Sequence, residues 1–154
     1  MYFDDYFSPL GKMRIASDGE AITGCWFEDQ KQPPAQSERF PCPVIAQAKQ
    51  WLDAYFQGER VPVTFPLRPD GTPFQKEVLA TLASLAYGQT TTYQAVARQM
   101  NKGSARAVGR AVARNPILIL IPCHRVLGTN GKLTGYAGGL ARKEALLRRE
   151  GVLR

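Results

Sequence analysis

The chain has 154 residues, of which 44% are hydrophobic, 10% aromatic and 21% charged, and its formal net charge is +7. This length and composition suit one compact unit or two small ones, and they exclude a large multidomain machine and wholesale disorder. The longest nearly uninterrupted apolar run, residues 117–122, is far shorter than the roughly 20 residues of a membrane helix. We therefore expect a soluble, cytoplasmic protein.

The first half of the chain is predicted to form three antiparallel strands and one helix. Residues 1–7, 12–17 and 21–27 alternate or run apolar, and glycine-containing turns separate them. A Gln- and Pro-rich stretch, residues 30–37, predicts a loop, and apolar residues at helical spacing predict a helix over residues 44–56 that Gly58 ends. Residues 61–67 alternate like a short edge strand.

The turn-forming residues 68–73 coincide with a change in charge. The first 70 residues carry 7 Lys and Arg against 10 Asp and Glu, whereas residues 71–154 carry 13 against 3. We place a domain boundary there, between an N-terminal α/β structural domain (1–70) and a second domain (71–154). A half this basic favours a polyanion such as nucleic acid as partner, with a solubilising surface as the alternative.

The second domain begins with three predicted helices. Pro73 and an apolar stripe predict a helix over residues 73–85, and a short helix is predicted over residues 93–100. After a Gly-containing turn, Ser104 caps a further helix, so that the last two form a helix-turn-helix pair. Its inward positions are predicted to be Ala105, Val108, Ala111 and Val112, whereas Arg106, Arg110 and Arg114 form an arginine ridge without interleaved acidic residues.

Beyond these helices, the continuous apolar run of residues 117–121 predicts a buried strand that ends just before Cys123. A turn at Asn130-Gly131 and a return strand over residues 132–136 would make a hairpin that resembles a wing. A last helix is predicted over residues 141–150.

Cys123 is followed directly by His124, the only histidine of the chain. A cysteine attacks as its thiolate, and its ordinary pKa of about 8.5 means that a neighbouring base or positive field is needed at neutral pH, which His124 and Arg125 could supply. In an extended chain the two side chains would point to opposite faces, so they would need a bridging water or an irregular backbone. On these two residues alone, a buried structural cysteine stays open as the alternative.

The other two cysteines, Cys25 and Cys42, are interpreted as structural. An odd number of cysteines without CxxC spacing argues against a disulfide framework or a zinc knuckle, and one histidine cannot build a His-rich metal site. We therefore expect no metal and no cofactor.

The residues around Cys123 form a specific motif. Residues 119–126, ILIPCHRV, resemble the active-site signature of the O6-alkylguanine-DNA alkyltransferases, also called methylated-DNA-protein-cysteine methyltransferases. Further segments match the family pattern in order: Gly71–Gln75, Ala105–Gly109, Asn115-Pro116, Gly135–Gly139 and Lys143–Gly151. The resemblance is strong from residue 72 to residue 151 and weaker before, where mainly residues 8–11 match.

The resemblance implies an α+β fold, with a ribonuclease-H-like sheet-and-helix domain followed by a winged helix-turn-helix domain. It implies a DNA repair protein that moves an alkyl group from O6 of guanine irreversibly onto Cys123, so that each molecule acts once. Transfer from O4 of thymine is left open. In that scheme His124 takes the thiol proton through a water and Glu150 orients His124. Asn115 would brace the site, and it could also cap the end of the preceding helix.

The resemblance also implies how DNA is held. The target atom lies within stacked DNA, so the base must be flipped out. Arg106 would fill the vacated space and Tyr93 would help to turn the nucleotide. Other DNA-binding positions are Ala105, Ala107 and Gly109, whose small size lets the helix approach the groove, together with Arg110 and Arg114. The base pocket would be lined by Tyr136, Ala137, Val126 and Gly138.

The expected partner is double-stranded DNA containing O6-alkylguanine, and no membrane partner is expected. The protein is expected to bind as a monomer, and cooperative binding along DNA is left open. Two rival functions are a DNA-binding module in which Cys123 is only a core residue, and a Cys-His hydrolase or thiol transferase. The first predicts no covalent product and the second predicts turnover. A basic helix-turn-helix fits the second rival poorly.

Overall fold

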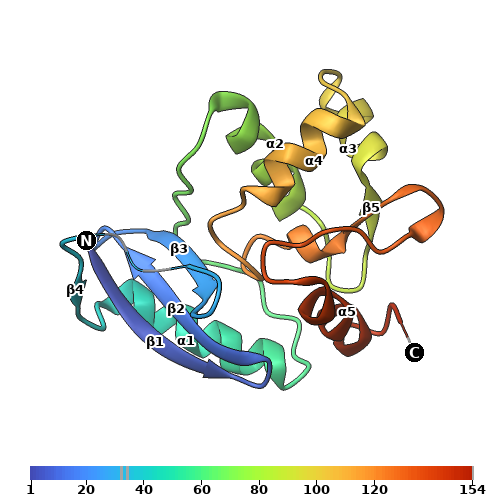
Figure 1. Ribbon diagram of the computed structural model, residues 1–154. Helices are drawn as coiled ribbons and strands as arrows, with labels where there is room; N and C mark the ends of the chain where they lie inside the picture. Colours follow the sequence, from blue (N-terminus) through green and yellow to red (C-terminus); the bar gives the residue numbers. More distant parts are fainter. Residues whose placement is uncertain (32, 34, 154) are drawn as a thin grey trace. The chain divides into compact units, whose positions relative to one another are not determined.

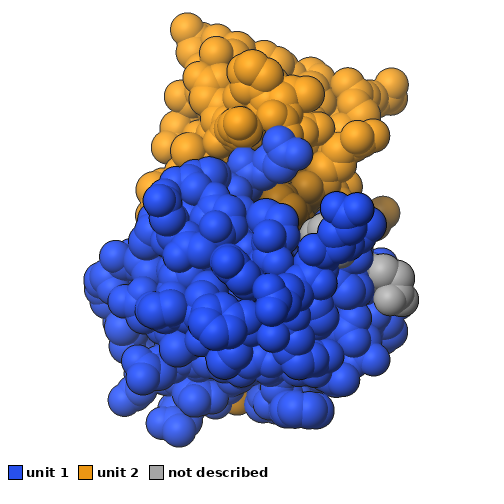
Figure 2. Space-filling view, turned by 90° about the vertical axis from the view of Figure 1, so that its left-hand side faces the viewer, with its two compact units in different colours: residues 1–70 blue, residues 71–154 orange. Residues whose placement is uncertain are grey.

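The computed structural model describes residues 1–31, 33 and 35–153, and the chain divides into two compact units, residues 1–70 and 71–154 (Figure 2). In the loop predicted over residues 30–37, Gln32 and Pro34 lie outside the described residues, as does Arg154 in the second domain. Each unit is described by itself below.

The first unit is built on an antiparallel meander, as predicted (Figure 1). Strands β1 (Tyr2–Ser8), β2 (Gly11–Ser17) and β3 (Ile22–Phe27) are neighbours, and β4 (Glu38–Arg39) pairs parallel to β1, so the sheet order is β3-β2-β1-β4. The β1–β2 turn is closed by Ser8, whose hydroxyl donates to the Gly11 carbonyl at 2.7 Å and accepts from the Leu10 amide at 3.1 Å. Strand β4 was not predicted, because two charged residues carry no apolar alternation.

Helix α1 (Pro43–Phe56) packs on this sheet and confirms the helix predicted over residues 44–56 (Figure 1). Its apolar positions are buried as the helical spacing requires: Val44, Ile45, Ala48, Leu52 and Tyr55. On the opposite side of the spacing, residues such as Gln50 and Asp53 remain exposed. The core of the first unit therefore lies between α1 and the meander.

The edge strand predicted over residues 61–67 is wrong. Among these residues only Leu67 makes a bridge, to Ile22, supported by the Ile22 amide donating to the Pro66 carbonyl at 2.9 Å. Pro62 and Pro66 lack the amide hydrogens that a continuous ladder needs, although their neighbours alternate in polarity.

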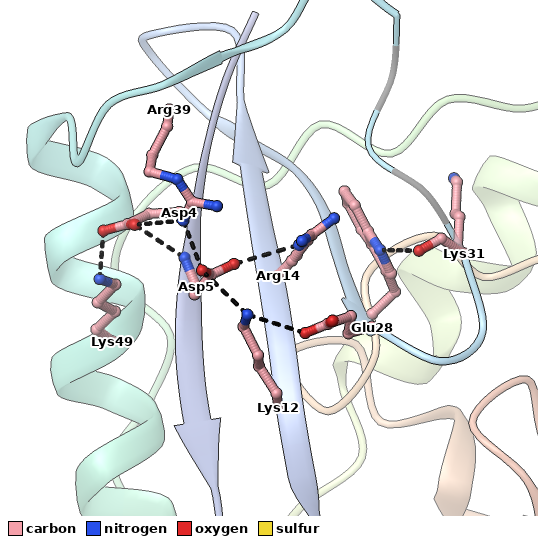
Figure 3. A network of polar contacts seen from close by, with 9 residues as sticks. Asp4, Asp5, Lys12, Arg14, Glu28, Lys31, Arg39 and Lys49 are labelled. Carbon is pink, nitrogen blue, oxygen red and sulfur yellow. Dashed lines mark hydrogen bonds and ion pairs between the residues drawn. The ribbon is translucent and has the colours of Figure 1, made fainter.

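Two adjacent acidic residues of β1 connect this strand to the other strands of the sheet and to helix α1 (Figure 3). Asp4 pairs with Lys49 of α1 at 2.5 Å, and Asp5 pairs with Arg14 of β2 at 3.2 Å and with Arg39 of β4 at 2.5 Å. Burial by itself raises the pKa of Asp5, but the hydrogen bonds and charges of Arg39 and its other cationic neighbours outweigh it and hold the pKa below its usual value. These ion pairs tie β1 to two strands and to the helix.

The second unit contains the four helices that the sequence predicted: α2 (Pro73–Ala83), α3 (Tyr93–Met100), α4 (Ala105–Ala113) and α5 (Leu140–Arg149). Thr72, Thr92 and Ser104 cap the first three, each side chain accepting from the amide three residues later. Helices α2, α3 and α4 pack against one another. The short strands β5 (Thr91–Thr92) and β6 (Val126–Leu127) pair in parallel.

The turn between α3 and α4 uses left-handed backbone twice, at Asn101 (φ 56°) and at Gly103 (φ 76°). A Cβ atom at Gly103 would lie 2.8 Å from the Phe74 ring, so the turn requires glycine there both for its conformation and for this close contact.

Of the helices in the described residues, none is long and apolar enough to span a membrane.

The strand predicted over residues 117–121 is wrong in conformation, although all five residues are buried. The segment folds into a tight turn in which Ile119 has φ 70° and the Ile121 amide donates to the Ile117 carbonyl at 3.2 Å. A buried apolar run satisfies burial in either form, so the apolar pattern alone does not distinguish a strand from a buried turn.

The return strand predicted over residues 132–136 is also wrong, so the wing is a loop rather than a hairpin. A 3-10 turn, η2 (Thr129–Gly131), lies where the Asn-Gly turn was expected, and the Gly128 amide donates to the Lys132 carbonyl at 2.8 Å. Residues 132–136 form no described strand, because β6 pairs with β5 instead.

Candidate active site

Cys123 begins a 3-10 turn, η1 (Cys123–Arg125), immediately after the buried turn of residues 117–121. Its residue is 1% exposed, and its amide donates to the Ile121 carbonyl at 2.8 Å. Burial raises the pKa of the thiol to about 11, against the opposing influence of a hydrogen bond from Asn115 and of the charge of Lys143. The thiol is therefore protonated at neutral pH and needs a base before it can attack.

His124 is completely buried next to Cys123 and contacts Glu150, 26 residues further along the chain. The distance between His124 Nε2 and Glu150 Oε2 is 2.6 Å. Because a carboxylate accepts only, Nε2 carries the hydrogen and Nδ1 carries the lone pair. Nδ1 is buried and has no hydrogen-bond partner among the described residues. Burial lowers the pKa of His124, which favours the neutral imidazole and leaves Nδ1 able to accept a proton.

Glu150 lies at the C-terminal end of α5 and accepts hydrogen bonds from three sides. Besides His124, Arg125 donates to it through Nε at 2.7 Å and through a terminal nitrogen at 3.1 Å, and the Gly88 amide donates at 2.9 Å. Gly88 has φ 78°, and a Cβ there would lie 3.3 Å from the Glu150 carbonyl oxygen. Glycine at position 88 therefore allows this close approach of the backbone.

Two buried cations of this site were not among the predicted site residues. Arg125 is 6% exposed and also donates to the Leu85 carbonyl at 2.9 Å. Lys143 is completely buried and donates to the Val126 carbonyl at 2.6 Å. Burial lowers the pKa of Lys143 to about 8. The sequence suggested Arg125 only as a possible source of positive field next to Cys123, and for Lys143 its place within a matched motif segment was the only signal, because a lysine in a sequence is normally interpreted as a surface residue.

Asn115 holds the buried turn in shape. Its side-chain nitrogen donates to the Ile121 carbonyl at 3.1 Å, and its side-chain oxygen accepts from the Ile117 amide at 2.9 Å. The capping role considered for Asn115 differs from this arrangement, because α4 ends at Ala113 and the side chain bonds forward to the turn. Asn115 thus connects the end of the α4 segment to the backbone that precedes Cys123.

The arginine ridge of α4 and its C-terminal cap, made of Arg106, Arg110 and Arg114, is exposed. Val108, Ala111 and Val112 are buried as predicted, but Ala105 is exposed, so its prediction as an inward residue is wrong. Ala105 is the first residue of α4, so helical spacing does not place it on the buried face of the helix in the way it places the later residues. Ala107 and Gly109 are partly exposed on the same helix.

Tyr93, at the start of α3, lies against α4 and against the loop that follows β6. Its hydroxyl and the Thr134 hydroxyl are 2.7 Å apart. A Cβ atom added to Gly109 would lie 3.8 Å from the Tyr93 ring, an ordinary contact that does not by itself require glycine. Thr134 was not predicted as a site residue, because its contact with Tyr93 joins segments 41 residues apart.

The four predicted pocket residues fall on β6 and on the loop before α5. Val126 is buried in β6, and the Tyr136 ring packs edge-on to His124 with ring centres 6.4 Å apart. Ala137 is partly exposed and Gly138 is buried. Among the described residues, no group of three or more His, Cys, Asp or Glu side chains could hold a metal ion.

Comparisons with known proteins match nearly the whole chain to one family. Residues 1–69 match the ribonuclease-like domain of 6-O-methylguanine DNA methyltransferase, and residues 73–152 match its DNA-binding domain. The methylated-DNA–protein-cysteine methyltransferase of Methanosarcina acetivorans is 43% identical over 98% of this chain and 99% of the relative, and that of Haemophilus influenzae is 40% identical over 99% and 87%. The crystal structure of Mycobacterium tuberculosis OGT in complex with DNA superposes with a TM-score of 0.90 at 37% identity, covering 99% of this chain and 95% of that one.

Proposed function

The chain belongs to the 6-O-methylguanine DNA methyltransferase family, and from this premise we propose that it transfers an alkyl group from O6 of guanine in double-stranded DNA to Sγ of its own Cys123. Its relatives carry methylated-DNA–protein-cysteine methyltransferase activity by name, and it shares that activity. The acceptor and the roles of individual residues are argued below from the geometry of this chain.

The observation that carries the proposal is a buried thiol followed in the chain by a buried histidine whose Nε2 is bound to a carboxylate and whose Nδ1 carries the lone pair. Cys123 is protonated at neutral pH, and His124 is neutral, with Nε2 occupied by Glu150 and Nδ1 available. A Cys-His pair backed by a carboxylate generates a thiolate on demand in a site that excludes bulk water. This arrangement supports Cys123 as nucleophile, His124 as general base and Glu150 as the group that orients the base.

The transfer balances without a cofactor. His124 Nδ1 takes the thiol proton, through one water in this scheme, and the thiolate forms an S–C bond while the C–O6 bond of the alkylated base breaks. O6 keeps the bonding electron pair, and the proton returns to the departing base, which leaves as guanine. The thioether on Cys123 has no facile route to hydrolysis, so each molecule reacts once.

Because the reacting thiol is buried and O6 of a stacked guanine is inaccessible, the base must leave the helical stack to react. The exposed ridge on α4 supports binding of that helix to DNA, with Arg110 and Arg114 on phosphates and Arg106 filling the space that the base leaves. Small residues at positions 105, 107 and 109 permit close approach to the groove. Tyr93 would help to turn the nucleotide.

The flipped base would lie against the loop after β6. Tyr136 packs against His124, so a base stacked on Tyr136 would lie near the reacting thiol. The backbone of Val126, Ala137 and Gly138 would then read the edge of the base. Preference among alkyl groups depends on the free space in this loop, and Ala137 adds no hydroxyl to it.

Intact-protein mass spectrometry tests the proposal. After incubation with duplex DNA containing O6-methylguanine, we expect one methyl-sized gain per molecule, saturating at one equivalent and mapping to Cys123. Cys123→Ala should bind the duplex and gain nothing, whereas Cys42→Ala should react as the wild type. A duplex containing O4-methylthymine tests the second substrate in the same way.

Three results would refute the proposal. Lesion binding without any mass gain would favour a damage-recognition module with an inert Cys123. Transfer that persists in Cys123→Ala would place the acceptor elsewhere. Multiple turnover on an ester or amide would favour a hydrolase instead.

A further inference from the structure

Arg125 is buried in the site and makes several polar contacts there, although the proposed transfer gives it no role. Its guanidinium donates twice to Glu150, at 2.7 and 3.1 Å, and once to the Leu85 carbonyl, at 2.9 Å. The guanidinium carbon also lies 6.0 Å from the centre of the Tyr87 ring. The fork of Arg125 is thus held on one side by the segment after α2 and clamps the carboxylate on the other.

We propose that Arg125 is a positioning residue of the alkyl transfer: by clamping Glu150, it keeps that carboxylate ionised and aimed at His124 Nε2, so that the His124 lone pair stays on Nδ1, where it can receive the thiol proton. The inference rests on the proposed function, in which His124 is the base. It extends that function from the Cys123-His124-Glu150 series to a fourth residue.

The geometry of Glu150 supports this role. The carboxylate offers Oε2 to His124 at 2.6 Å while Arg125 and the Gly88 amide hold Oε1 at 2.7 and 2.9 Å. With three donors besides the imidazole, the carboxylate has one fixed orientation, and its basicity is reduced. A proton on His124 Nε2 therefore stays on the imidazole rather than moving to Glu150.

The charges around His124 act in the same direction. The groups that face it are Glu150, Arg125 and Lys143, with the Cys123 thiol and the Tyr136 ring completing its surroundings. Only Glu150 is anionic, and it favours the imidazolium, whereas burial and the two cations oppose it. Removing the positive charge of Arg125 removes part of this opposition, so the His124–Glu150 pair should take up its proton at higher pH.

A merely structural Arg125 would stabilise the fold without affecting this proton. Two substitutions separate the possibilities. Arg125→Met removes the charge and the fork but keeps a long apolar side chain, and Arg125→Lys keeps the charge but loses the two-pronged contact. Arg148→Met is the matched control, because Arg148 is an exposed arginine that pairs with Glu144 one turn away on α5.

Nitrogen NMR of the imidazole is the direct measurement, because His124 is the only histidine of the chain and needs no assignment. In the full-length wild-type protein and in Arg148→Met, we expect the Nε2–H tautomer with unprotonated Nδ1. In Arg125→Met, protonation of the pair should occur at a pH at least about one unit higher. Arg125→Lys should stay within about half a unit of the wild type.

The same variants are then compared in alkyl transfer to Cys123. The acid limb of the rate profile should move with the NMR titration in Arg125→Met, whereas Arg125→Lys should be several-fold slower at every pH with its limb unmoved. An unchanged titration in Arg125→Met would overturn the proposal, as would a shift of the same size in Arg125→Lys.

If Arg125→Met does not fold, Arg125→Gln takes its place, because it also removes the charge but keeps a polar side chain: protonation of the pair at a pH at least about one unit higher supports the proposal, and an unchanged titration overturns it. The titration needs no DNA. A wild-type protein that shows the tautomer pattern but transfers no alkyl group would therefore refute the proposed function while leaving the placement of the proton by Arg125 intact.

Discussion

Cys123 and Cys25 are both buried thiols, yet their surroundings differ. Burial raises the pKa of Cys25 to about 12, and among the described residues no group opposes it. At Cys123 burial also dominates, but the Asn115 side chain and the Lys143 charge lower the pKa again, to about 11. The Cys123 site therefore tolerates a thiolate better than an ordinary core position does, without stabilising it at rest.

The first prediction concerns pH. A thiol whose pKa is raised is protonated below that pKa, so its unassisted reaction gains about tenfold in rate per pH unit until the pH reaches about 11. In wild-type protein His124 removes the proton locally, so the dependence above neutral pH should be shallow. We expect His124→Ala to be about 10²- to 10⁴-fold slower at pH 7 and to recover steeply as the pH rises.

Single-turnover transfer from O6-methylguanine duplex, measured between pH 6 and pH 10, checks this prediction. Cys42→Ala is the control, because it alters another buried cysteine outside the site. A His124→Ala variant that matches the wild type at pH 7 would exclude His124 as the base.

Among the elements, α4 shows why local signals predicted some features and missed others. Its start at Ser104 and its exposed ridge followed from capping chemistry and from the spacing of three arginines. The segment after it, residues 117–121, is a buried turn instead of a strand, because Asn115 bonds to the backbone at both ends of the turn. A side chain that replaces a ladder partner leaves no trace in apolar periodicity.

The second prediction concerns Arg106 on this helix. If Arg106 stabilises the flipped state, Arg106→Ala should slow repair of duplex DNA at least about tenfold while leaving the reaction with free O6-benzylguanine nearly unchanged, because a free base needs no extrusion. Arg110→Ala is the matched ridge variant and should weaken DNA binding without this split. Rates of both substrates, measured side by side in each variant, test the assignment.

An equal loss on duplex and free base in Arg106→Ala would remove this role from Arg106. An equal split in Arg110→Ala would mean that the ridge acts as a whole, with no single residue entering the stack.

At the scale of the whole molecule, the basic charge belongs to the second unit. Residues 71–154 carry 13 Lys and Arg against 3 Asp and Glu, and all three acidic residues pair with basic side chains: Glu77 with Lys102, Glu144 with Arg148 and Glu150 with Arg125. In the first unit the acidic residues outnumber the basic ones, and Asp4 and Asp5 of β1 belong to a network of ion pairs (Figure 3). The unit matched to the DNA-binding domain of the family is thus the one that carries the positive field.

The third prediction follows from this distribution. Affinity for duplex DNA should fall linearly on a plot of log affinity against log salt concentration, because bound Lys and Arg side chains release condensed counterions. Removing Arg110 and Arg114 together should reduce the slope by about 1 to 2. Fluorescence anisotropy at several salt concentrations measures it, and a flat response would contradict binding dominated by phosphate contacts.

Local sequence patterns were enough to predict the helices, the β1–β3 meander, the sign and place of the charge, and the motif that identified Cys123 and His124. These are local properties: caps, periodicity, turns and neighbouring letters act within a few residues of one another. The α+β class follows from them, and so does the family resemblance that the comparisons confirmed.

The assembly of the site depends on contacts between segments that lie far apart in the chain. His124 meets Glu150 across 26 residues, Arg125 meets the Leu85 carbonyl across 40, and the Gly88 amide meets Glu150 across 62. Residue spacing does not encode which buried donor reaches which acceptor, because that pairing depends on how α5 packs on the turn that holds Cys123. Arg125 and Lys143 belong to the site for the same reason: their burial, which a sequence does not display, places Arg125 against Glu150 and the charge of Lys143 near the Cys123 thiol.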